Sequence, residues 1–131
     1  MLFLDACAII YSLEAADQRG NRVRSLVRAH LDNTNSPVLI SSLSLLECRV
    51  LPKREGNASL LARYDRFFTS DDVQIIELTH DILHRATDLR VRYTIRTPDA
   101  LQAACALSHN AEFVTGDKRF LSIQELRVTL V

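Results

Sequence analysis

The chain has 131 residues, of which 47% are hydrophobic and 24% are charged, a composition typical of a globular protein with a buried core. Its 16 basic and 16 acidic residues cancel, which argues against a generic polyanion-binding protein. However, 14 of the basic residues are Arg, the side chain best suited to bidentate phosphate contacts, so nucleic acid is not excluded. We expect one domain over residues 1–131.

The sequence contains no apolar run of the ~20 residues that a membrane-spanning helix needs. The first ten residues include Asp5 and no basic residue, so they lack the pattern of a signal peptide. The cysteines, Cys7, Cys48 and Cys105, are widely spaced and odd in number, which favours buried, reduced thiols over disulfides or a zinc site. We therefore expect a cytoplasmic protein that does not bind membranes.

Strand and helix patterns alternate along the chain. We predict strands at 1–5, 37–41, 73–78, 112–115 and 127–131. Between them we predict helices at 6–17, 18–33, 42–51, 58–70 and 80–93; the helix at 42–51 stops at Pro52, and Thr79 caps the helix at 80–93. A last helix starts at Pro98, with Thr97 as its N-cap, and ends at His109–Asn110. This alternation predicts an α/β fold in which helices cover both faces of a parallel sheet.

Four carboxylates fall where such a sheet binds ligands, outside the carboxyl ends of its strands. Asp5 ends the first strand, and Asp117 follows the fourth strand by two residues. Glu47 and Asp99 fall in the early turns of the helices predicted from residues 42 and 98. Because four like charges in one cleft repel each other, we expect one or two Mg²⁺ or Mn²⁺ ions to offset the repulsion.

Two of these carboxylates also have simpler explanations. Asp99 in a first helical turn is favoured by the helix dipole. Glu47 is the last residue of Ser44-x-x-Glu47, which matches a capping box, although Ser41 and Ser42 are equally good caps. Glu47 also shares a helix face with leucine and valine side chains, where an unpaired charge is costly. The apolar residues on that face are Leu43, Leu46 and Val50.

The segments FLDACAII, ISSLSLLECRV, RTPDALQAACAL and FVTGDKRF resemble the PIN-domain nucleases, and among them the VapC-type toxins of bacterial and archaeal toxin–antitoxin pairs. The resemblance runs from Leu2 to Phe120. It implies a PIN-like three-layer α/β/α sandwich with a central parallel sheet of four or five strands. It also implies metal-dependent cleavage of RNA, a small antitoxin protein that blocks the site, and a homodimer.

By this resemblance, the four carboxylates match the acidic metal-binding positions of the family, and a polar residue of the fourth strand supports them. The acidic positions are Asp5, Glu47, Asp99 and Asp117, and the supporting residue is Thr115. The chain departs from the family pattern at Ala6 and Cys7, where many relatives have Ser, Thr or Asn. A hydroxyl or amide that would hydrogen-bond the site is therefore missing.

These observations predict a Mg²⁺- or Mn²⁺-dependent endoribonuclease that hydrolyses RNA phosphodiester bonds with a metal-activated water. One alternative is a PIN-fold module that binds RNA or protein without catalysis. Another is a magnesium-dependent phosphatase with Asp5 as nucleophile. Such enzymes usually carry a second carboxylate two residues further on, and here that residue is Cys7.

Three basic groups could contact RNA phosphates or simply face solvent. They are Lys118 with Arg119, the Arg residues at 90, 92 and 96, and the Arg residues between 19 and 28. The last group could instead bind the antitoxin. The segment HDILH at 80–84 is similar to the HExxH zinc motif. However, the apolar face of that helix excludes His80 and His84, and no third ligand is evident. We interpret these histidines, and Asp71 with Asp72, as surface residues.

Overall fold

The computed structural model describes all 131 residues and contains one five-stranded sheet in which every pairing is parallel. The strand order is β3-β2-β1-β4-β5. The strands are β1 (Leu2–Leu4), β2 (Val38–Ser41), β3 (Val73–Ile76), β4 (Glu112–Thr115) and β5 (Val128–Leu130). The predicted α/β sandwich is thereby confirmed, with β1 at the centre of the sheet between β2 and β4.

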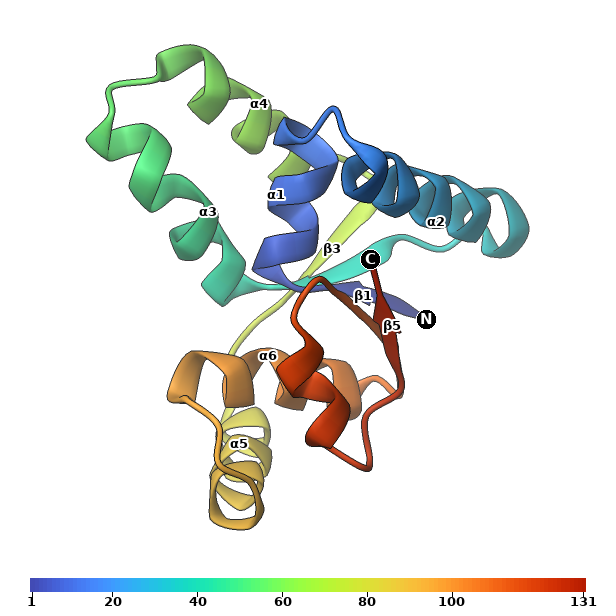
Figure 1. Cartoon of the computed structure of the whole chain (residues 1–131), viewed down its shortest axis with the longest axis vertical. Helices are drawn as coiled ribbons and strands as arrows, with labels where there is room; N and C mark the ends of the chain where they lie inside the picture. The colour runs from blue at the N-terminus through green and yellow to red at the C-terminus, as the bar shows by residue number, and fades with distance from the viewer.

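Helices cover both faces of this sheet (Figure 1). One face carries α1 (Ala6–Glu14), α2 (Gln18–Thr34), α3 (Ser42–Arg54) and α4 (Ala58–Phe68). The other carries α5 (His80–Arg92), α6 (Thr97–Ser108) and a 3₁₀ helix, η1 (Lys118–Ser122). None of these helices combines the length and the apolar character needed to span a bilayer.

The alternation of side chains along the strands divides the core into two layers. Phe3 and Phe113 face α5 and α6, and their rings stack with centroids 5.5 Å apart. Leu4 and Val114, one position further along each strand, belong to the layer under α1 and α2. Because each fully buried side chain of this size contributes roughly 1.5–3 kcal/mol, the pairing of β1 with β4 is strongly fixed. That pairing aligns the strand ends that precede Asp5 and Asp117.

Helix α6 lies close to the sheet because its buried face is made of small residues. Ala100, Ala103, Ala104 and Ala106 are all completely buried in the core layer that includes Phe3. Alanine has the best intrinsic helix propensity and adds little bulk between helix and sheet. This packing places Asp99, in the first turn of α6, at the carboxyl edge of the strands.

Several predicted helix boundaries are wrong. Helix α1 ends at Glu14 and not at residue 17, because Asp17 caps the next helix, and helix α4 ends at Phe68 and not at residue 70. Helix α3 continues through Pro52 to Arg54. Proline removes one N–H near the end of the helix, but the amide of Glu55 still donates to the carbonyl of Leu51, so the last turn is retained. Helix α6 begins at Thr97 rather than after it, and the hydroxyl of Thr97 accepts from Arg90 instead of capping the helix.

The corner between α1 and α2 depends on a glycine. Asp17 caps α2 by accepting hydrogen bonds from the amides of Arg19 and Gly20, at 3.1 and 3.2 Å. A Cβ at position 20 would overlap the carbonyl oxygen of Ala15 and lie 2.7 Å from that of Tyr11. Because both atoms belong to the backbone, they cannot move aside without displacing the end of α1.

Gly20→Ala should therefore lower the free energy of unfolding by about 2 kcal/mol, the usual cost of an overpacked site. At an ordinary helical position the same change would stabilise the protein by ~1 kcal/mol. Urea unfolding of this variant and of Ser25→Ala, an exposed control in the same helix, measures the difference. A Gly20→Ala variant as stable as the wild type would contradict this account of the corner.

Candidate functional site

Asp5 is a buried carboxylate fixed by two hydrogen bonds. It follows β1 directly and caps α1, with Oδ1 accepting from the amide of Ala8 at 2.8 Å. Its Oδ2 accepts from the hydroxyl of Thr115, the last residue of β4, at 2.6 Å. Only 5% of Asp5 is exposed, and Thr115 is completely buried. The side chain is therefore held in one orientation at the end of the central strand.

The ionised form of Asp5 is unfavourable in this position. Burial raises the pKa of Asp5 to about 6, against the lowering effect of the Thr115 and Ala8 hydrogen bonds. The negative charges of Glu47 and Asp117 raise the pKa of Asp5 further. A cation bound beside Asp5 would relieve this destabilisation.

Glu47 is held by a buried glutamine of the neighbouring helix. Its Oε1 accepts from Nε2 of Gln102 at 2.8 Å, and the same nitrogen donates to the hydroxyl of Ser44 at 3.0 Å. Partial burial raises the pKa of Glu47, and the charge of Asp99 adds to the effect. Gln102 was not predicted as a site residue. The sequence feature that could have indicated it is a long polar side chain within the alanine-rich segment of α6, three residues after Asp99.

The predicted surroundings of Glu47 are partly wrong. Helix α3 and helix α4 project beyond the sheet (Figure 1), so the face shared by Glu47, Leu46 and Val50 is not an apolar interior. Leu46 is 61% exposed and Val50 is 42% exposed. The N-cap of α3 is Ser41, so Ser44 and Glu47 do not form a capping box. The cost of placing Glu47 here comes from Asp5, Asp99 and its own partial burial, and not from leucine neighbours.

Asp99 and Asp117 are both paired with arginine. Arg119 binds both oxygens of Asp117, with Nη2 to Oδ2 at 2.5 Å and Nε to Oδ1 at 3.0 Å. This guanidinium lowers the pKa of Asp117. Nη2 of Arg119 also lies 3.9 Å from Oδ2 of Asp99, and Nε of Arg96 lies 3.6 Å from the same oxygen. From the sequence, these arginines were predicted as phosphate contacts and not as partners of the acids.

The structure thus brings the predicted residues to one edge of the sheet through a chain of contacts. Thr115 connects Asp5 to Asp117, since its hydroxyl donates to Asp5 and accepts from the amide of Asp117 at 3.0 Å. Arg119 connects Asp117 to Asp99, and Glu47 interacts electrostatically with both Asp5 and Asp99.

The donor set consists only of carboxylate oxygens, which suits a hard cation such as Mg²⁺ or Mn²⁺. In the arrangement observed, no three carboxylate, imidazole or thiol groups lie close enough together to hold a metal ion. Arg119 donates hydrogen bonds to both oxygens of Asp117. A metal ion could therefore reach Asp99 and Asp117 together only if the guanidinium of Arg119 moved away. The residues fit a divalent cation in their chemistry, with Arg119 as the competing positive charge.

The departure from the family pattern at Cys7 has a structural role. The Cys7 thiol accepts a hydrogen bond from the amide of Gly116 at 3.3 Å, and a Cβ at position 116 would lie 2.6 Å from the ring of Tyr11. Cys7 and Tyr11 therefore hold the turn between Thr115 and Asp117. All three cysteines are free, with Cys48 and Cys105 buried as predicted and Cys7 partly exposed.

Two other predictions are confirmed. His80 and His84 are exposed surface residues, opposite the buried face of α5 that contains Ile82 and Leu89. Asp71 and its neighbour Asp72 lie in an exposed turn before β3.

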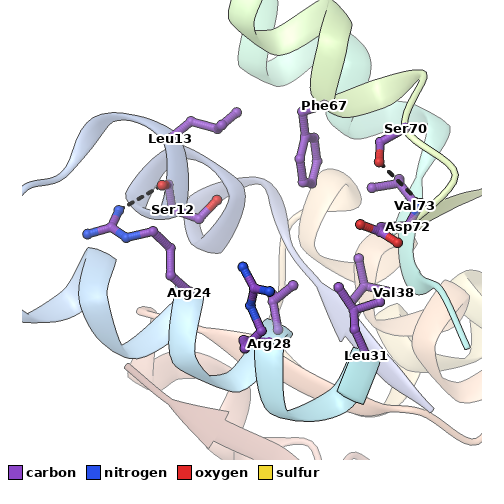
Figure 2. A pocket seen from close by; sticks show the side chains of 11 residues that line it. Ser12, Leu13, Arg24, Arg28, Leu31, Val38, Phe67, Ser70, Asp72 and Val73 are labelled. Carbon is purple, nitrogen blue, oxygen red and sulfur yellow. Dashed lines mark hydrogen bonds between the residues drawn. The ribbon is translucent and has the colours of Figure 1, made fainter. Parts of the chain in front are cut away.

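A separate cavity of about 380 Å³ lies at the opposite edge of the sheet, where β2 and β3 begin (Figure 2). It is mostly apolar, with side chains from α1, α2 and the end of α4. The lining includes Leu13, Val27, Leu31, Phe67, Arg28 and Asp72. None of the four predicted acids reaches it, so this cavity is not part of the site described above.

Comparison with known proteins agrees with the resemblance noted in the sequence. The family model described as PIN domain matches residues 2–126. No curated protein sequence matches the chain significantly.

Solved structures show the same fold at low sequence identity. VapBC2 from Rickettsia felis, bound to a DNA fragment of its promoter, is 19% identical over 99% of this chain and 98% of that chain, with a TM-score of 0.83. A toxin–antitoxin complex from Klebsiella pneumoniae is 23% identical over 98% and 96%, with a TM-score of 0.76. VapC20 from Mycobacterium tuberculosis, a Sarcin-Ricin loop cleaving toxin, is 19% identical over 97% and 99%, with a TM-score of 0.72. At these identities the likeness is one of fold.

The raised pKa of Asp5 predicts a pH-dependent effect on stability. Because the folded pKa lies above the unfolded value, the folded state binds more protons between these values, and Asp5 loses its favourable contribution as pH rises through about 6. In metal-free buffer, the stability of Asp5→Asn relative to the wild type should therefore increase by about 2–3 kcal/mol between about pH 4 and about pH 8. Urea unfolding at several pH values measures this. A relative stability that does not change with pH would rule out the raised pKa.

Proposed function

This chain belongs to the PIN-domain family, and on that basis we propose that it is a metal-dependent endoribonuclease, the toxin of a VapBC-type toxin–antitoxin pair. One structural neighbour, VapC20, is a Sarcin-Ricin loop cleaving toxin. The observation that carries the proposal is the set of acids at the carboxyl edge of the sheet. Thr115 connects Asp5 with Asp117, and Arg119 connects Asp117 with Asp99.

The residues of this edge divide the work of phosphodiester hydrolysis between them. Asp5 and Asp99 are the proposed direct ligands of Mg²⁺ or Mn²⁺, and Asp117 and Glu47 bind it directly or through water. When bound, the ion supplies an activated water and neutralises charge on the phosphate. Thr115 keeps Asp5 in one orientation, and Gln102 does the same for Glu47.

The two arginines next to the acids can then act on the substrate. A guanidinium displaced from Asp117 keeps its planar set of donors, which matches the oxygens of a phosphate. Arg119 and Arg96 are 64% and 71% exposed, so both can reach a phosphate at the rim of the site. Because the attacking group is water and not the 2′-hydroxyl of the RNA, the expected products carry a 5′-phosphate and a 3′-hydroxyl.

The proposed protein partner is a cognate antitoxin. One structural neighbour is VapBC2 and another is a toxin–antitoxin complex. The contact between Arg119 and Asp117 shows that a guanidinium fits among these acids. An arginine or lysine of an antitoxin could therefore neutralise the site in the same way. We also propose a homodimer, on the family resemblance alone.

One observation favours a second candidate, a PIN-fold module that binds RNA or protein without catalysis. Arg96 and Arg119 already offset the charges of Asp99 and Asp117, so the fold does not require a metal ion. A phosphatase is less well supported, because both oxygens of Asp5 accept hydrogen bonds and Asp5 is only 5% exposed, which makes it a poor nucleophile.

Asp99→Asn should reduce RNA cleavage at least about a thousandfold, because it removes a proposed metal ligand. The measurement is cleavage of total RNA with Mn²⁺, together with circular dichroism to show that the variant folds. Asp71→Asn, which neutralises an exposed acid far from the site, is the matched control and should remain active. Cleavage that survives in Asp99→Asn would overturn the nuclease proposal, and a wild type that binds RNA but never cleaves it would favour the module.

Arg119→Gln should strengthen Mn²⁺ binding several-fold at low ionic strength, because the variant lacks the cation that competes for Asp117 and Asp99. Isothermal titration calorimetry measures the affinity. Arg85→Gln removes the same charge from an exposed position on α5 and should leave the affinity unchanged. Weaker Mn²⁺ binding in Arg119→Gln would show that the guanidinium supports the ion instead of competing with it.

A further inference from the structure

A hollow of about 500 Å³ lies beside the acidic edge, and four of its nine lining residues are arginine. It is formed by the end of α5, the α5–α6 connection, the start of α6 and one residue of η1. We call it the arginine hollow. Its lining comprises residues 90–96, Asp99 and Arg119. These residues include four Arg and a single Asp, whereas the chain as a whole has no net charge.

The arginine hollow is continuous with the proposed nuclease site. Asp99 and Arg119 line the hollow and also belong to the group of contacts that includes Asp117. A polyanion that lies in the hollow therefore reaches the acids without crossing another element of the structure.

The arginines at the rim have donors available for a ligand. A guanidinium has five N–H donors. Arg92 uses one nitrogen on Glu125, at 2.8 Å. The side chain of Arg96 makes no hydrogen bond, and its Nε lies 3.6 Å from Oδ2 of Asp99. Both side chains are more than half exposed, at 55% and 71%.

Arg90 plays a different part, because it fixes the wall of the hollow. Its Nη1 donates to the hydroxyl of Thr97 at 2.7 Å, and its Nε donates to the carbonyl of Ile95 at 3.2 Å. These bonds hold the connection between α5 and α6 in shape, so the hollow is built before any ligand arrives.

We propose that the arginine hollow binds the phosphodiester backbone of the RNA strand on one side of the bond that is cleaved. This inference rests on the proposed ribonuclease activity and adds to it the path of the substrate. Planar guanidinium groups match phosphate oxygens and contact the backbone without regard to sequence. An RNA strand is favoured over an acidic peptide because the hollow opens directly onto the acids proposed to hydrolyse a phosphodiester.

The test compares two charge-matched double variants in their affinity for a fluorescein-labelled, unstructured RNA oligonucleotide in EDTA. Arg92→Gln with Arg96→Gln should weaken binding about tenfold. It should also reduce the slope of log affinity against log salt concentration by about 1–1.5, as expected for two lost phosphate contacts on a single strand. Arg54→Gln with Arg66→Gln, two exposed positions on α3 and α4 without ion pairs, is the control and should bind like the wild type. Fluorescence anisotropy measures both quantities.

Three results would overturn the proposal. The two double variants could lose affinity equally, which would indicate general electrostatic attraction. Both double variants could keep the affinity of the wild type for RNA, which would place the RNA elsewhere. Or the hollow variant could lose affinity for an oligoglutamate peptide while its affinity for RNA stays unchanged.

Cleavage assays with Mn²⁺ separate this inference from the proposed function. An active hollow variant with unchanged KM would overturn the subsite while the nuclease stands. A wild type that binds RNA through the hollow but does not cleave it would overturn the nuclease while the subsite stands.

Discussion

The hydrogen bond from Thr115 to Asp5 connects the fold to the proposed chemistry. It joins the ends of the two central strands, β4 and β1, and it keeps a buried carboxylate in a single orientation. The strands themselves are fixed by the stacked rings of Phe3 and Phe113, which lie in the core between the sheet and helices α5 and α6. A small rearrangement of this core would therefore shift Asp5 relative to Asp117, so the precision of the site depends on the packing of the sheet.

Charge is the second constraint on this edge of the molecule. The burial of Asp5 and its proximity to Glu47 and Asp117 disfavour its ionised form, whereas Arg96 and Arg119 offset the charges of Asp99 and Asp117. Asp117 is the most fully neutralised acid, because Arg119 contacts both of its oxygens. In our account the same arginine alternates between two partners, the acids in the free protein and the phosphate of a bound substrate. This alternation would couple occupation of the acidic site to binding in the arginine hollow.

Much of the fold could be predicted from the sequence, because the period of hydrophobic residues directly reports burial. The strands that contain Phe3, Leu39 and Phe113 were predicted at the correct positions, as was the alanine-rich face of α6. Pro52 misled the prediction because a single missing amide near a helix end is tolerated. The exposure of Leu46 could not be predicted, since apolar periodicity does not reveal that α3 extends beyond the sheet.

The four acids could be identified from their positions after strands and in early helical turns, but their partners could not. The pairing of Arg119 with Asp117 and of Gln102 with Glu47 depends on side-chain positions that only the tertiary structure specifies.

The central claim is that Asp5, Asp99 and Asp117 bind one divalent cation at the carboxyl edge of the sheet. Paramagnetic broadening of backbone amide signals in NMR spectra tests it directly, because substoichiometric Mn²⁺ broadens nearby nuclei first. We expect the amides of residues 5–8, 99–100 and 115–119 to broaden together and to recover when excess Mg²⁺ is added. Broadening centred on another surface, or no saturable broadening at all, would contradict the account.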